Sequence, residues 1–141
     1  MSTKFLTTSA LQTKKAGETL AKKILKAKLG RKAKALGLIG DLGGGKTTFL
    51  QGFAKGLGIK AKINSPTFVI MKRFGNFYHF DCYRIEKPKE LLDLGFKKII
   101  ANPKNIVAIE WADRIKKILP KSTIWLNFQF INATTRQIML K

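Results

Sequence analysis

A glycine-rich segment constrains the fold of this chain more than any other stretch. Residues 40–47, Gly-Asp-Leu-Gly-Gly-Gly-Lys-Thr, match the phosphate-binding pattern G-x-x-x-x-G-K-[ST] at every required position. The apolar run at 34–39 indicates a buried strand, and apolar residues recur at helical spacing from Phe49 to Leu57. Because this pattern belongs between a strand and a helix, the chain is predicted to adopt an α/β fold.

The residue types in this segment suit the binding of a nucleotide's phosphates. Glycine lets main-chain N–H groups approach phosphate oxygens closely, and a helix start adds unsatisfied N–H groups. Lys46 would reach the outer phosphates, and the Thr47 hydroxyl would bind Mg²⁺. The alternative interpretation is a flexible glycine turn before an ordinary helix. The predicted phosphate-binding residues are Gly43, Gly44, Gly45, Lys46, Thr47 and Thr48.

The length of 141 residues predicts a single domain over 1–141, with room for a sizeable core. No stretch approaches the roughly 20 apolar residues of a membrane span, and the first residues contain no apolar signal core. The one cysteine, Cys82, excludes an internal disulfide framework and favours a reducing, cytoplasmic location. Cys82 lies in an apparent strand, so packing is favoured over reactivity.

The charge balance is strongly basic, with 28 basic and 8 acidic residues and a net charge of +20. Such an excess suggests a polyanionic partner, and RNA is the obvious candidate. Lysines outnumber arginines 23 to 5 and are spread along the chain, so lysine-favouring coding bias is an equal alternative. No aromatic-studded single-strand platform accompanies the charge.

Two carboxylates stand at the ends of predicted strands. Asp81 can coordinate Mg²⁺ through water or orient an attacking water molecule, and the alternative is an ion pair with Arg84. Glu110 ends the next apolar strand, where phosphate-loop enzymes place a second Mg²⁺ ligand. The alternative there is a surface acid paired with a lysine. The only histidine, His79, is interpreted as structural rather than catalytic.

Hydrophobic periodicity predicts the remaining elements. The expected helices cover 10–29, 87–95 and 112–119, and the expected strands cover 68–71, 77–81, 105–109, 124–130 and 136–141. The pair at 68–71 and 77–81 is a hairpin signal, so the sheet must be mixed. The strand at 136–141 is expected at a sheet edge, and Ser9 is a suitable N-cap for the first helix.

The polar segment Ser65-Pro66-Thr67 admits two interpretations. Its proline stiffens the chain, which on spacing alone favours a rigid turn. In a nucleotide enzyme the same segment could be a switch with a hydroxyl near the γ-phosphate.

The combination of motifs resembles the TsaE (YjeE) family, the small bacterial ATPase of the threonylcarbamoyladenosine tRNA-modification system. The resemblance spans about residues 9 to 120 in order and spacing, which is far more specific than the phosphate loop alone. Gly44 departs from the family's usual alanine, and the very basic balance is also atypical. The motifs that carry it are Gly40 to Thr48, Ser65-Pro-Thr67, His79 to Arg84, Pro88 to Leu91 and Ile109 to Trp111.

The resemblance implies a single-domain P-loop fold with a mixed, mainly parallel central sheet flanked by helices and containing an antiparallel hairpin. It implies ATP with Mg²⁺, slow hydrolysis that depends on partners, and docking onto the TsaD–TsaB pair, whose TsaD subunit transfers the threonylcarbamoyl group to adenosine in tRNA. Contact with tRNA through that complex is implied, and direct RNA contact remains open.

The resemblance also implies roles for individual residues. Lys46 and Thr47 carry over as phosphate and Mg²⁺ contacts, Glu110 as the Mg²⁺-side acid and Asp81 as a hydrolysis residue. By the same resemblance the switch interpretation of Thr67 becomes the better one. The remaining implied neighbours of the site are Trp111, with Ser9 and Arg136 near the base pocket.

Three rival functions compete with the ATPase interpretation. A small-molecule kinase shares the glycine loop but needs an acceptor pocket and usually an arginine-rich lid, and the five arginines are not clustered. A GTPase lacks support because no Asn-Lys-x-Asp segment is present to read guanine. An RNA-binding module that keeps a nucleotide only as a structural ligand is the non-catalytic alternative.

Overall fold

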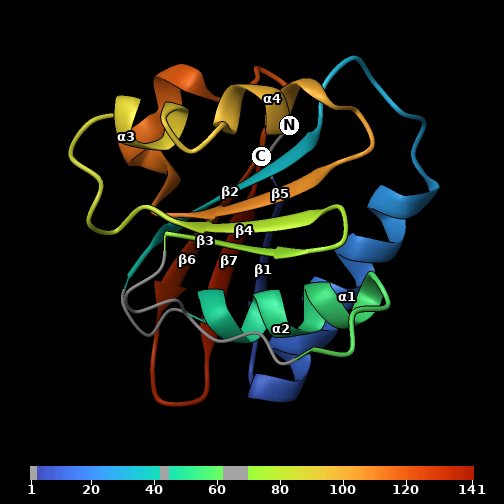
Figure 1. Ribbon diagram of the computed structural model, residues 1–141. Helices are drawn as coiled ribbons and strands as arrows, with labels where there is room; N and C mark the ends of the chain where they lie inside the picture. The colour runs from blue at the N-terminus through green and yellow to red at the C-terminus, as the bar shows by residue number, and fades with distance from the viewer. Residues whose placement is uncertain (1–2, 42–44, 62–69) are drawn as a thin grey trace. The chain divides into compact units, whose positions relative to one another are not determined.

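The computed structural model describes residues 3–41, 45–61 and 70–141. These residues group into two compact units, shown with their element labels in Figure 1. The first unit is built from segments 1–27, 40–65 and 126–141, and the second from segments 28–39 and 66–125. The chain passes between the units inside two of its strands, after residue 39 and after residue 125.

The first unit packs two helices beside an antiparallel group of strands. Helix α1 spans Ala10–Lys26 and α2 spans Lys46–Gly56; the strands are β1 (Thr3–Thr7), β6 (Ile124–Phe130, whose first two residues belong to the second unit) and β7 (Arg136–Leu140). Strand β7 pairs with both neighbours, so that Ile138 lies opposite Phe5 and Phe128. The buried rings of Phe49 and Phe128 meet edge to face at 5.4 Å and join α2 to this sheet.

Strand β7 is therefore not the edge strand that the sequence predicts. Strand β1 lies outside it and pairs along its whole length. The two apolar residues of β1, Phe5 and Leu6, are adjacent, so its sequence lacks the alternation by which a half-buried strand is recognised. The last strand is an inner strand because this short first strand covers it.

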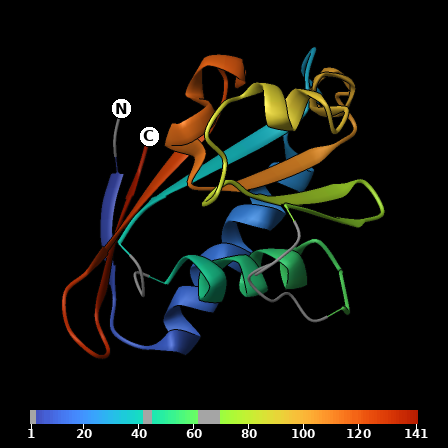
Figure 2. The same ribbon diagram turned by 60° about the vertical axis from the view of Figure 1, so that its left-hand side comes forward.

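Helices α1 and α2 lie side by side in both views (Figure 1, Figure 2). Glycines permit this approach: a Cβ atom added at Gly17 would lie 2.1 Å from the Phe49 carbonyl oxygen, and one at Gly52 would lie 1.8 Å from the Lys14 carbonyl oxygen. The two helix backbones are therefore in direct contact. Ser9 accepts a hydrogen bond from the Gln12 N–H and caps α1, as predicted, although α1 ends three residues before the expected position 29.

The second unit is organised around β5 (Ile106–Glu110), whose five residues are all buried. Strand β5 pairs in parallel with β2 (Lys34–Gly40, whose last residue belongs to the first unit) and with β4 (Phe77–Asp81). Strand β3 (Met71–Phe74) closes an antiparallel hairpin with β4. A continuous apolar run is what a parallel strand needs when both of its faces are covered.

Short helices complete the second unit. These are α3 (Lys89–Leu92), α4 (Phe96–Ala101) and the 3-10 helix η1 (Ala112–Ile118). The expected helix at 87–95 is only one turn long, because Gly95 adopts a φ of +84° and starts α4 in a new direction. The sequence did not predict α4.

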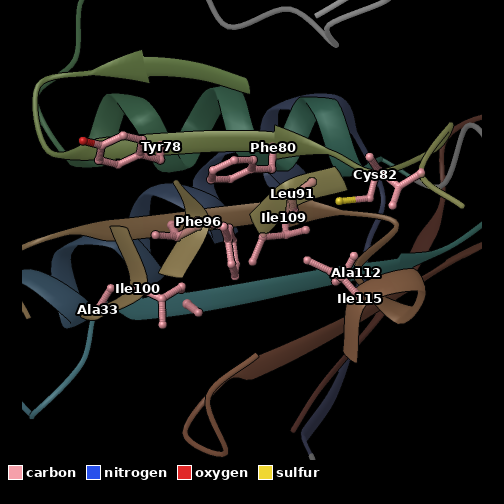
Figure 3. Close-up of a cluster of buried hydrophobic side chains, with 13 residues drawn as sticks. Ala33, Tyr78, Phe80, Cys82, Leu91, Phe96, Ile100, Ile109, Ala112 and Ile115 are labelled. Atoms are coloured by element: carbon pink, nitrogen blue, oxygen red, sulfur yellow. The ribbon is translucent and has the colours of Figure 1, made fainter. Parts of the chain in front are cut away.

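The hydrophobic core of the second unit lies against β4 and β5 (Figure 3). Phe80 and Phe96 meet edge to face at 5.2 Å, which fastens α4 to β4. Cys82 lies within this core and is fully buried. The predicted mixed α/β fold with an antiparallel hairpin is confirmed, while the assignment of 1–141 to one domain stays a prediction. No helix in the described ranges is long and apolar enough to cross a membrane.

Candidate nucleotide-binding site

Helix α2 begins at Lys46, directly after the glycine loop, as predicted. Its N-cap Gly45 has a φ of +98°, a backbone conformation that residues with a side chain rarely adopt. The residues before it, 42–44, include Gly43 and Gly44 and lie outside the described part of the chain. Thr47 and Thr48 are half-buried and occupy the first turn of α2. Their backbone N–H groups have no hydrogen-bond acceptor within the helix, because the first four N–H groups of any α-helix lack one.

The side chain of Lys46 is held at the entrance of the loop. Lys46 is only 6% exposed, and its Nζ donates hydrogen bonds to the carbonyl oxygens of Gly40 and Asp41, each at 2.9 Å. A buried ammonium requires such oxygen partners. The geometry therefore places one positive charge at the point where the loop begins.

The entrance of the loop is itself tied to β6. The Asp41 N–H donates to the Phe128 carbonyl oxygen at 3.1 Å, and the Asp41 carboxylate accepts from the Phe130 N–H at 3.3 Å. A Cβ atom at Gly40 would lie 2.0 Å from the Phe128 carbonyl oxygen, so only glycine fits there. Gly40 thus serves strand packing, and Asp41 fixes the direction in which the loop leaves the sheet.

Arg136 borders the start of α2. A Cβ atom built on Gly45 would lie 3.4 Å from Cγ of Arg136 and 3.4 Å from Cγ2 of Thr13. The Arg136 guanidinium donates to the carbonyl oxygens of Asn132 and Thr135 and lies 4.7 Å from the centre of the Phe130 ring. Arg136 therefore adjoins the glycine loop, and Ser9 serves as a helix cap. Contact of either residue with the base of a nucleotide stays a prediction.

In the second unit the two predicted acids end neighbouring strands. Asp81 lies opposite Glu110 across the parallel β4–β5 pair, and Leu38 of β2 lies opposite Glu110 on the other side. Leu38 precedes the first glycine of the loop by two residues. The carboxyl ends of these strands therefore bring both acids to one edge of the sheet, as the sequence predicts.

Glu110 is buried and is hydrogen-bonded to the only histidine. Its Oε2 lies 2.7 Å from His79 Nε2, and the two side chains are 4% and 1% exposed. His79 Nδ1 is buried without a hydrogen-bond partner among the described residues. The alternative of a surface acid paired with a lysine is therefore wrong for Glu110.

Sequence reasoning did not connect His79 with the site. The signal was present, because His79 and Asp81 are two residues apart in one strand and so share a face. Asp81 is opposite Glu110, and a side chain as long as histidine bridges the diagonal. The Asp81 carboxylate accepts a hydrogen bond from the Tyr83 N–H at 2.9 Å, which shapes the turn after β4.

The turn that follows Glu110 has an unusual backbone. Trp111 has a φ of +57°, and it is the only non-glycine residue in the described ranges with a positive φ. Such a conformation costs on the order of 1–3 kcal/mol and is concentrated near functional sites. The Trp111 ring packs against Tyr83 at 5.1 Å, and the Arg114 guanidinium lies 5.9 Å from each of these two rings. The aromatic contact holds Trp111 directly beside Glu110.

Cys82 follows Asp81 but is not part of any exposed site. Burial, together with the neighbouring Asp81 carboxylate, raises the pKa of the Cys82 thiol to about 12. The thiolate is therefore scarce at neutral pH, and the predicted packing role is confirmed.

The acid pair fits magnesium better than a transition metal. Within the described ranges no cluster of three or more His, Cys, Asp or Glu side chains could hold a metal ion. Mg²⁺ instead takes one or two carboxylates together with waters and substrate phosphates, which is what Asp81, Glu110 and the Thr47 hydroxyl would offer. Residues 45–48 belong to the first unit and the acids to the second, so their meeting over one nucleotide stays a prediction. Ser65, Pro66 and Thr67 lie outside the described residues.

Comparison with known proteins gives a consistent result. The family model described as "Threonylcarbamoyl adenosine biosynthesis protein TsaE" matches residues 7–138. The protein named tRNA threonylcarbamoyladenosine biosynthesis protein TsaE from Bacillus subtilis (strain 168) is 38% identical over 125 residues, covering 86% of this chain and 77% of the relative. The protein of the same name from Rickettsia typhi is 36% identical over 109 residues, covering 74% of each chain.

A solved structure agrees with the sequence comparisons. The crystal structure of YdiB from Bacillus subtilis superposes with a TM-score of 0.75 at 28% identity, covering 99% of this chain and 84% of that chain. The fold and the sequence motifs therefore lead to the same family. The chain belongs to the TsaE family, which takes part in the biosynthesis of threonylcarbamoyl adenosine.

Proposed function

We propose that this chain is the Mg²⁺-dependent ATP-binding and ATP-hydrolysing component of the tRNA threonylcarbamoyladenosine machinery. In this proposal it acts with the TsaD–TsaB complex in the cytoplasm and does not perform the transfer itself. The observation that carries the proposal is the buried Lys46, which begins α2 at the end of a complete phosphate-binding pattern. Family membership supports the tRNA-modification context.

The first unit supplies phosphate binding. The unsatisfied N–H groups at the start of α2 would donate to a bound anion, and the Lys46 ammonium would add a full positive charge beside them. Its present partners, the carbonyl oxygens of Gly40 and Asp41, hold the ammonium beside the loop, which supports its assignment to the outer phosphates. The Thr47 hydroxyl is assigned to the magnesium side.

The second unit supplies two carboxylates with different tasks. His79 occupies Oε2 of Glu110, so Oε1 is assigned to the water shell of the metal. Bound magnesium would neutralise charge on the transferring phosphate. Asp81 is half-buried at the neighbouring strand end and is assigned to orient the attacking water.

Slow hydrolysis by the isolated chain is part of the proposal. Phosphoryl transfer needs a positioned water and positive charge on the transferring group, and Arg84 is exposed in the turn after β4. We assign completion of the pocket to the assembly with TsaD–TsaB. Added partner proteins should therefore raise the rate of phosphate release.

The test compares matched lysine variants on one helix. Lys46→Ala should abolish ATP binding measured by calorimetry and phosphate release measured with and without TsaD–TsaB. Lys55→Ala removes an exposed lysine of the same helix and should leave both unchanged. Rapid hydrolysis by the chain alone that partners do not alter, or unchanged ATP binding in Lys46→Ala, would overturn the proposal.

A second pair of variants tests the acids. Glu110→Gln should lower phosphate release by at least about a hundredfold while retaining ATP binding, because it removes charge needed in the transition state. Glu86→Gln, at an exposed acid after β4, is the matched control.

A further inference from the structure

A basic groove in the second unit is separate from the proposed nucleotide site. Its volume is about 730 Å³, and it lies between the segments 28–35 and 119–124. Five basic residues line it: Lys28, Arg31, Lys32, Lys34 and Lys121. Lys34 begins β2, whereas the glycine loop follows the opposite end of that strand.

Among the residues that the structure describes, no acidic side chain lines this groove. Lys28, Arg31, Lys32 and Lys121 are exposed, while Ala33 on the floor is buried. Two lysine–carboxylate ion pairs, Glu18–Lys22 and Lys89–Asp93, lie outside the groove. Like charges that converge on one concave surface without carboxylates focus a positive potential there.

The backbone on both sides of the groove is fixed by hydrogen bonds. The N–H groups of Ala33 and Lys34 donate to the carbonyl oxygens of Ile100 and Asn105, at 2.8 and 3.1 Å. On the other side, the turn that carries Lys121 is closed by Thr123, whose hydroxyl donates to the Pro120 carbonyl oxygen at 2.6 Å. The cations therefore project from an anchored frame.

We propose that this groove binds the sugar–phosphate backbone of structured RNA. The side chains that line it are hydrogen-bond donors, apart from the Ser122 hydroxyl and the apolar floor. Phosphate oxygens only accept hydrogen bonds, so a lining of cationic donors fits a sugar–phosphate backbone. The inference rests on the proposed function, because a chain that works in tRNA modification meets structured RNA.

None of the described residues that line the groove is aromatic, which narrows the class of RNA that it would bind. Single-stranded RNA is held by stacking its bases on aromatic rings, which this groove does not offer. Duplex regions are recognised by shape and phosphate contacts instead. Binding should therefore be insensitive to base sequence and should be as strong for a tRNA or an RNA duplex as for a single strand of equal length, or stronger.

The experiment compares two variants of the full chain with equal loss of charge. The groove variant carries Lys28→Gln, Arg31→Gln, Lys32→Gln and Lys121→Gln. The control variant carries four substitutions of exposed lysines away from the groove, Lys55→Gln, Lys97→Gln, Lys98→Gln and Lys104→Gln. Both variants are first matched to the parent chain by circular dichroism and thermal unfolding.

Affinity for labelled tRNA and for an RNA duplex is measured by fluorescence anisotropy at several salt concentrations. Each neutralised phosphate contributes roughly 0.7–0.9 to the slope of log affinity against log salt. The groove variant should lose at least about tenfold in affinity at ~100 mM salt, and its slope should fall by roughly 3; the control variant should change affinity less than about twofold. Equal losses in both variants would mean diffuse charge attraction and overturn the proposal.

Two further measurements distinguish RNA binding by the groove from a protein interface and from the proposed ATPase function. If the groove variant binds RNA like the parent chain but loses self-association or binding to TsaD–TsaB, the groove is a protein interface and the proposal is wrong. ATP binding and hydrolysis are measured on the same samples. Groove-dependent RNA binding in a chain that does not bind ATP would uphold the groove while refuting the proposed ATPase.

Discussion

The Nε2 atom of His79 lies 2.7 Å from Oε2 of Glu110, and both side chains are buried. This contact fixes the carboxylate plane of the acid that ends β5. Ligands and acids at catalytic sites are commonly oriented by such outer partners. His79 is thereby a positioning residue for Glu110, acting through a hydrogen bond from the neighbouring strand.

The first prediction concerns His79. His79→Ala should destabilise the protein by about 3 kcal/mol, because it leaves a buried carboxylate without its partner. It should also raise the Mg²⁺ concentration needed for half-maximal phosphate release, while His79→Gln, which keeps an N–H donor, should restore part of the magnesium response. The measurement is a Mg²⁺ titration at fixed ATP beside urea unfolding. A variant that loses stability but keeps the parent magnesium curve would show a structural role alone.

The contact between α1 and α2 predicts strong sensitivity at Gly52. A methyl group there meets the Lys14 carbonyl oxygen at 1.8 Å, so Gly52→Ala should lower the free energy of unfolding by at least about 2 kcal/mol. Gly30→Ala is the matched control, since nothing lies within 4 Å of its added Cβ atom. Urea unfolding of both variants measures the difference. Equal stability of Gly52→Ala and the parent chain would contradict the close packing.

Cys82 predicts a pH dependence of stability with a definite sign. The pKa of its thiol is raised from 9.0 to about 12 in the folded chain, so the folded state retains a proton that the unfolded state loses. The contribution is complete below pH 9 and is lost as the pH rises toward 12, by up to about 1.4 kcal/mol per pH unit. Unfolding free energies at pH 8 to 10.5 should fall more steeply for the parent chain than for Cys82→Ala, which isolates this group from the titrating lysines.

The same burial predicts that the thiol is inert in the native state. A thiol-reactive dye at pH 8 should label Cys82 only after denaturation. Labelling of the native chain at the rate of an exposed cysteine would contradict this prediction.

Arg136 predicts an effect on nucleotide affinity. Its side chain adjoins Gly45, so Arg136→Gln should weaken ATP binding about tenfold to a hundredfold, the range expected when one charged contact is lost. Arg73→Gln, at an exposed arginine of the β3–β4 hairpin, is the control. Comparing ATP with adenosine by calorimetry locates the loss: a change with ATP alone indicates a phosphate contact, and an equal change with both indicates the base.

Much of this fold and site could be predicted because its signals are local. The glycine loop is one short segment with a fixed spacing, and β5 is one short apolar run. Each of the two acids directly ends such a run, so all of these signals are local in the sequence. Strand β1 escaped prediction because its apolar residues do not alternate and it exists by pairing with β7, 130 or so residues away in the chain. Helix α4 was not predicted because it depends on the burial of Phe96 and Ile100 in the core, which is a tertiary contact.

The His79–Glu110 contact shows the same division within the site. Sequence spacing places each residue on its own strand, but only the pairing of β4 with β5 brings the two side chains together. The interpretation of His79 as structural rather than catalytic was made from its own strand and stays a prediction. Tertiary contacts decide such roles, and they are absent from any local pattern.

Gly17 and Gly52 also couple the position of α1 to that of α2 in the first unit. At these two glycines the main chains of α1 and α2 are in direct contact. No side chain lies between them there that could absorb a displacement of one helix. A displacement of the first turn of α2, where an anion would bind, is therefore expected to displace α1 as well. Binding of an anion at the start of α2 would then change the positions of the exposed lysines of α1.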